Sequence, residues 1–286
     1  MLLDKIRAIE QRYASMVSTA DACGRESVDR LTPTGWSAVD AVLGGGLVDS
    51  GLHEWFGAGE GCEGSAASSR RGRWTAPVCL MVHLAWRAMD RSVSPRWAVW
   101  IGQACFPYPR VLVRGDPGDM RLLDRSVFVA PKSAADRLWA VDLAVRSPSS
   151  SVVIADGGGF NMAATRRLHL AARREHKWIL LVRPPWELGV LSAAHSRWRV
   201  SRPLGETLPE AMLFDGGEES SEPGASGMNP SWRVALLRYK GLQLEKVRSE
   251  WALEWHRGEG AVDLSAPLAR AAGGEAAAAS IRAAAG

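Results

Sequence analysis

A glycine-rich loop, residues 57–66, follows a short apolar run that is typical of a buried strand. A strand followed by such a loop is the setting of a phosphate-binding loop, in which a lysine and a hydroxyl come directly after the last glycine. When the frame G-x-x-x-x-G-K-[ST] is placed on Gly59 and Gly64, Ser65 takes the lysine position and Ala66 the hydroxyl position. This frame lacks both the ammonium that neutralises the β- and γ-phosphates and the hydroxyl that binds magnesium.

A second frame begins at Gly57, directly after the apolar run. It places Cys62 at the second glycine, Glu63 at the lysine and Gly64 at the hydroxyl. Both frames therefore predict a degenerate loop, and we expect no cofactor and no enzymatic activity.

Two polar residues follow later apolar runs. Gln103 comes after the run 96–101, at a place where a hydrolytic site needs a carboxylate to polarise water, and an amide cannot take the proton. Asp156 closes the run 151–155. A carboxylate there either holds magnesium through water or is a structural residue at a strand end, and we favour the structural role because the lysine and hydroxyl are missing.

Composition sets broad limits on function. The 286 residues are 47% hydrophobic and 23% charged, as in ordinary globular proteins, and the net charge of +4 permits a polyanionic partner without requiring one. The four cysteines form no C-x-x-C pair and have no zinc-ligand spacing with the six histidines, so no metal is expected. No apolar run is long enough to cross a bilayer, and a cytoplasmic protein without membrane contact is expected.

Apolar strands alternate with amphipathic helices along the middle of the chain. The predicted strands are 52–56, 96–101, 125–130, 151–155, 177–182, 232–239 and 251–256, and the predicted helices are 36–43, 74–89, 134–146 and 163–174. This alternation predicts an α/β fold with a mostly parallel central sheet covered by helices on both faces, to which antiparallel strands are added near the C-terminus.

Composition also divides the chain into five segments. We expect an N-terminal amphipathic helix and tether, a core, an acidic flexible linker, C-terminal strands that complete the core, and a low-complexity tail. These segments are 1–30, 31–214, 215–231, 232–268 and 269–286.

The N-terminal helix carries an apolar stripe at alternating three- and four-residue steps. Its members are Leu2, Ile6, Ile9, Tyr13 and Met16. Such a stripe either packs on the helix's own domain or docks on another protein molecule, and both alternatives remain open. Because the polar tether isolates this helix from the core, neither alternative is preferred.

A basic cluster, Arg70, Arg71 and Arg73, follows the degenerate loop. Three interpretations are open: a solvated surface, which we favour; a contact with DNA phosphates or an acidic partner; or a substitute for the missing lysine.

Thirteen tryptophans are present, and most fall inside predicted elements, where they are expected to be buried. Those inside elements include Trp74, Trp86, Trp97, Trp139 and Trp178. Trp36 and Trp186 lie near element ends and are candidate interface anchors, although a core position is preferred for them too.

Several segments, in this order, resemble the RecA superfamily. Residues 32–57 resemble the entry to a RecA core, residues 96–109 the strand and loop that carry its catalytic glutamate, and residues 151–156 its Walker B strand. Residues 166–185 and the closing segments 232–241 and 251–265 look like the ImuA family, the RecA-related accessory proteins of bacterial mutagenic translesion synthesis, and the resemblance covers residues 31–265. Here Gln103 matches the glutamate position and Asp156 the acidic Walker B position.

The resemblance implies a non-catalytic adaptor in a translesion complex that DNA damage induces. The implied partners are a Y-family polymerase-like protein of the ImuB type, RecA, and, indirectly, an error-prone polymerase and the sliding clamp. The two loops that read DNA in RecA match short segments here with Phe160 and Trp186 as their only aromatic residues, so any contact with DNA is expected to be weak. The alternatives are a DNA-dependent ATPase of recombination and repair, and a cell-division inhibitor of the SulA type.

Overall fold

The computed structural model describes residues 30–59, 74–91, 96–115, 118–201, 230–243, 249–256 and 261–264. The chain divides into two units after Arg30, and every element below belongs to the second. The apolar stripe of residues 2–16, the arginine cluster at 70–73 and the acidic stretch 215–229 lie outside the described residues.

One nine-stranded sheet, in the order β13-β12-β11-β10-β3-β9-β8-β6-β7, organises this unit. The strands from β10 to β7 in this order are parallel to one another, and β11, β12 and β13 add to β10 in antiparallel pairs. The bounds are β3 (Gly51–Phe56), β6 (Trp97–Ile101), β7 (Ser126–Val129), β8 (Ser150–Asp156), β9 (Trp178–Arg183), β10 (Ser196–Ser201), β11 (Ser231–Tyr239), β12 (Glu250–His256) and β13 (Ala261–Leu264). The predicted fold class, a mostly parallel sheet with antiparallel strands at its C-terminal end, is confirmed.

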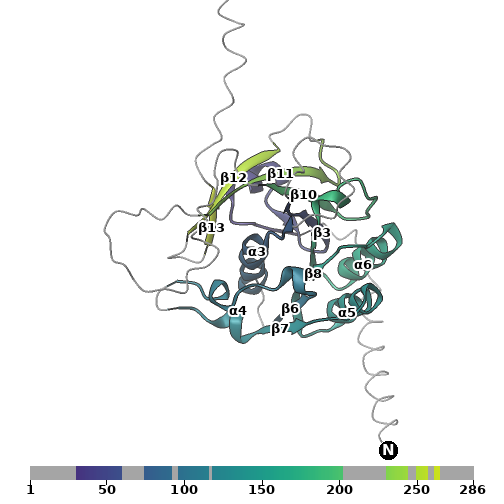
Figure 1. Cartoon of the computed structure of the whole chain (residues 1–286). Coiled ribbons are helices and arrows are strands. Elements are labelled where there is room, and N and C mark those ends of the chain that lie inside the picture. The colour runs from purple at the N-terminus through teal and green to yellow at the C-terminus, as the bar shows by residue number, and fades with distance from the viewer. Residues whose placement is uncertain are drawn as a thin grey trace, which may run out of the picture. The chain divides into compact units, whose positions relative to one another are not determined.

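Helices cover both faces of the parallel part. α2 (Ser37–Leu43) and α3 (Val78–Asp90) pack on one face, and α5 (Ala134–Arg146) and α6 (Met162–Arg174) on the other, so that β8 lies between them in Figure 1. Alternate residues of β8 therefore enter two separate cores: Val152 and Ile154 face α3, whereas Val153 and Ala155 face α5 and α6. A strand buried on both faces must be apolar throughout, which is why its sequence shows no alternation.

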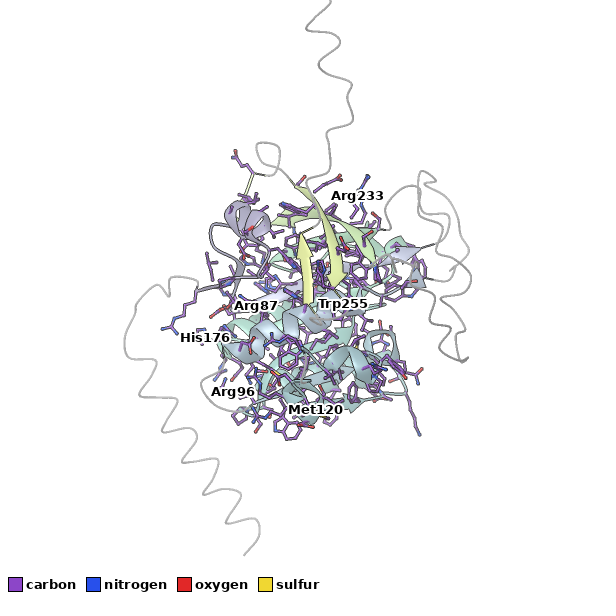
Figure 2. All side chains as sticks on the ribbon, turned by 90° about the vertical axis from the view of Figure 1, so that its left-hand side faces the viewer. Arg87, Arg96, Met120, His176, Arg233 and Trp255 are labelled. Carbon is purple, nitrogen blue, oxygen red and sulfur yellow. The ribbon has the colours of Figure 1, made fainter. Side chains whose placement is uncertain are left out.

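Shorter elements complete the unit. Two small antiparallel pairs join β1 (Leu31–Thr32) to β2 (Leu47–Val48) and β4 (Ala58–Gly59) to β5 (Trp74–Thr75). The remaining helices are α4 (Arg121–Asp124) and the 3₁₀ turns η1 (Gln103–Cys105), η2 (Pro109–Leu112) and η3 (Pro185–Glu187). Figure 2, seen from the α3 side, places Arg233 of β11 and Met120 beside α4 at opposite ends of this unit.

The sequence did not reveal β10, which joins the parallel and antiparallel parts. Its residues alternate between buried Trp198 and Val200 and the partly or fully exposed arginines between and beside them, so it lacks the continuous apolar character of its parallel neighbours. Only one face of this strand is packed against a hydrophobic core, because α5 and α6 cover strands further along the sheet.

The helix predicted from residue 74 begins later. Trp74 and Thr75 pair with Gly59 and Ala58, and Pro77 precedes the first helical residue, Val78. Proline is accepted at a helix start because it has no amide hydrogen to satisfy.

Two tryptophans expected in the core are exposed. Trp139 on α5 is 63% exposed, and Trp97, the first residue of β6, is 41% exposed. Trp36 is buried, as preferred, and its Nε1 donates to the Val262 carbonyl oxygen at 2.8 Å.

Candidate functional site

The carboxyl ends of β3, β9, β8 and β6 lie along one edge of the sheet. In open α/β sheets ligands bind at this edge. Gly57 follows β3, Asp156 ends β8 and Gln103 follows β6, so the predicted residues that the structure describes are distributed along this edge. Gly64, Ser65, Ala66 and the arginines at 70–73 lie outside the described residues.

Gly57 is required by the packing of its own chain. A Cβ atom at this position would lie 2.2 Å from the Thr75 carbonyl oxygen and 2.7 Å from the Trp74 ring. The Gly57 amide donates to the Arg183 carbonyl oxygen at 2.9 Å. The first glycine of the loop therefore accommodates the β4–β5 pair, and its amide is already bonded.

The helix that follows this loop opens without groups that hold phosphate. In a phosphate-binding loop, the lysine and hydroxyl stand at the start of that helix, where free amides and the helix dipole attract the anion. In α3 the start is Pro77, Val78 and Cys79, which have neither an ammonium nor a hydroxyl. Ser65 and Glu63, the lysine positions of the two frames, lie outside the described residues.

Asp156 is held by a cation from α5. The Arg137 guanidinium lies 3.0 Å from the Asp156 carboxylate and also donates to the Gly158 carbonyl oxygen. It lies 5.4 Å from the centre of the Phe160 ring. The other Asp156 oxygen accepts from the Gly158 amide at 2.9 Å. The charge that would attract magnesium is thus neutralised within the chain.

The end of β6 is packed tightly on Asp156. Gly102 has φ +92°, and a Cβ atom there would lie 2.8 Å from the Asp156 Cβ and 3.2 Å from the Arg137 Cδ. Gln103, the next residue, is exposed at the start of η1 and offers an amide where a base is needed. Burial raises the pKa of the neighbouring Cys105 thiol to about 12, so it is not a nucleophile at neutral pH.

A buried charge network beneath this edge was not predicted. Arg183 at the end of β9 donates to Glu54 of β3 at 2.6 Å and to Glu187 at 2.6 Å. Arg197 of β10 donates to the other Glu54 oxygen at 2.9 Å. The sequence signal was available: Glu54 and Arg183 are charged residues inside or at the end of apolar strands, and such residues are almost always paired.

Glu187 extends this network to the loop after β8, since its carboxylate accepts from the Gly159 amide at 2.9 Å. The acidic and basic groups along the edge thus bind one another. Among the described residues, no group of histidine, cysteine and acidic side chains is arranged to hold a metal ion. The described helices include none long and apolar enough to cross a membrane.

Comparison with known proteins gives the fold. No family model matches the chain, and no curated protein matches its sequence. A solved structure described as the RadB recombinase is similar over 82% of this chain and all of its own length, with a TM-score of 0.50 and 12% identity. The chain therefore has a RecA-like fold.

Proposed function

We propose that this RecA-like chain is an adaptor without ATPase activity that belongs to a mutagenic translesion synthesis complex. The observation that carries the proposal is that the edge where a RecA-like ATPase would hold its nucleotide is engaged by the chain's own side chains. Arg137 neutralises Asp156, and Pro77 and Val78 open α3 where a lysine and a hydroxyl are needed.

The translesion role rests on the resemblance of residues 31–265 to the ImuA family. The partner is then a Y-family polymerase-like protein of the ImuB type, with RecA as a further partner and an error-prone polymerase and the sliding clamp reached indirectly. The described edge gives little support for direct binding of DNA. Phe160 is buried, so Trp186, which is 39% exposed and packs edge-on against Trp74, is the one aromatic residue of the two loops that a base could reach, whereas a stacking platform needs several.

The test is to co-express the full chain with a Y-family polymerase-like protein from the same genome and to purify the pair by size exclusion. We expect one stable complex that releases no phosphate from ATP, with or without single-stranded DNA. The absence of a complex, together with DNA-stimulated hydrolysis, would favour the alternative of a recombination ATPase.

A further inference from the structure

The outer surface of α5 and α6 exposes three large apolar side chains. The two helices lie side by side on one face of the sheet (Figure 1), and their inner residues are buried in the core beneath them. On the outside, Trp139 is 63% exposed, Leu143 55% and Leu170 57%. Single exposed apolar residues are ordinary, but three on adjoining helices require an explanation.

An ion pair shows that the exposed parts of the two helices adjoin. Asp142 of α5 accepts from Arg167 of α6 at 2.8 Å, and also from Arg146 of its own helix at 3.1 Å. Leu143 follows Asp142 in sequence, and Leu170 lies three residues after Arg167, on the same side of α6. We call the exposed side chains around this ion pair, from Trp139 to Arg146 and from Arg166 to Arg174, the α5–α6 face.

The α5–α6 face is positively charged. α6 has four arginines and no acidic residue between Met162 and Arg174. Arg166 and Arg174 are exposed, and neither makes an ion pair with any residue in the described ranges. Asp142, the acidic residue between the helices, is already bound to two arginines, so the face has uncompensated cations beside apolar groups.

This composition fits a protein partner better than DNA. The phosphates of DNA would pair with the arginines of this face, but they would leave Leu143 and Leu170 without an apolar contact. Tryptophan and arginine are the residues that contribute most at protein interfaces, and a surface formed by two adjoining helices accepts a third amphipathic helix. The helix predicted from the sequence at residues 2–16 has the wrong charge, because it has Lys5, Arg7 and Arg12 against Asp4 and Glu10.

We propose that the α5–α6 face binds an acidic amphipathic helix of the polymerase-like partner. The apolar side of that helix covers Trp139, Leu143 and Leu170, and its carboxylates pair with Arg166 and Arg174. The identity of the partner rests on the proposed function, whereas the place and chemistry of the contact rest on the structure.

The test measures the affinity of the full-length chain for the purified full-length polymerase-like partner. Leu143→Asp and the double variant Arg166→Glu/Arg174→Glu remove the apolar and the charged contacts separately. The matched controls are Leu191→Asp and Arg110→Glu, which change exposed residues outside α5 and α6. All substitutions are on the surface, and a thermal melt of each variant verifies that it folds.

We expect each α5–α6 variant to weaken binding about tenfold or more and both controls to leave it within about twofold. Exchanging the partner's acidic residues for lysines should restore binding to the arginine-to-glutamate variant. Unchanged binding by folded variants overturns the inference and leaves the adaptor function intact. Tighter binding by the double variant also overturns it. That result would mean that an acidic segment of the same chain covers the face in the wild type and competes with the partner. A wild-type chain that does not bind the partner overturns both proposals.

Discussion

The Arg183 guanidinium donates to the Glu54 carboxylate at 2.6 Å, and both side chains are completely buried. This pair connects the strand before the degenerate loop to the strand before the Pro184–Pro185 turn. Arg197 and Glu187 complete the network, so Arg183 and Glu54 each pair with two opposite charges. A buried charge is tolerated in a protein core only when it is paired in this way.

We expect Arg183→Met to lower the free energy of unfolding by about 3–5 kcal/mol, because it leaves the buried charge of Glu54 with one partner fewer. Urea unfolding at pH 7 measures the change. The control is Arg199→Met, since Arg199 and Glu250 are 3.6 Å apart and about half exposed, and its effect should stay within about 1 kcal/mol. Equal effects of the two substitutions would contradict a special role of the buried network.

We expect the purified chain to hydrolyse no ATP, because the start of α3 lacks a lysine and a hydroxyl and because Arg137 neutralises the Asp156 carboxylate. Phosphate release is measured with and without single-stranded DNA, and a thermal-shift titration with ATP and magnesium tests for binding alone. Turnover that disappears in Asp156→Ala would show that Asp156 serves catalysis after all.

Gly102 and Gly159 offer a matched pair of substitutions. Both have positive φ, +92° and +81°, but a Cβ atom meets nothing within 4 Å at Gly159 and lies 2.8 Å from the Asp156 Cβ at Gly102. Gly159→Ala should cost only the backbone strain of about 1–2 kcal/mol, and Gly102→Ala should cost at least about 1 kcal/mol more. Chemical denaturation of both variants gives the difference, and an equal loss would mean that β6 can move away from Asp156.

Burial, with the charges of His195 and His169 as further causes, lowers the pKa of His53 from 6.5 to about 3. Its Nδ1 lies 2.7 Å from the Ser196 hydroxyl. His53 is therefore protonated near pH 6.5 in the unfolded chain but stays neutral in the folded chain. The free energy of unfolding falls as the pH falls from 6.5 towards 3. The expected loss from this residue at pH 5 relative to pH 7 is about 2 kcal/mol.

His53→Asn should remove this part of the acid sensitivity, although it also lowers stability at pH 7. The quantity to compare is the slope of unfolding free energy against pH between 5 and 7, with the exposed His176→Asn as control. A His53→Asn slope equal to that of the wild type would refute the assignment.

The apolar stripe of residues 2–16 remains a prediction, since it lies outside the described residues. If it docks on a partner, Ile6→Asp/Ile9→Asp should leave the melting temperature unchanged and abolish co-purification, because each buried isoleucine contributes about 1.5–3 kcal/mol to the contact. A lower melting temperature with intact partner binding would show that the helix packs on its own domain.

The sequence alone predicted the fold class and most of the elements. The apolar run at 151–155 is continuous because both faces of β8 are buried, and the run at 251–256 alternates because only one face of β12 is buried. Whether apolar residues alternate along a strand depends on whether one or both of its faces are buried, so the segment's own sequence shows which case applies. The same holds for the glycine that ends α2, because Gly44 adopts φ +75°.

Only the tertiary structure showed how the candidate site is occupied. Arg137 reaches Asp156 from a different helix, and Glu54 and Arg183 meet from strands 129 positions apart in sequence. The start of α3 at Val78 depends on the pairing of Trp74 and Thr75 with residues across the loop. The composition of a segment reports whether its neighbours are apolar or polar, but not which residues they are. Ion pairs and strand pairs between distant segments are therefore decided when the sheet assembles.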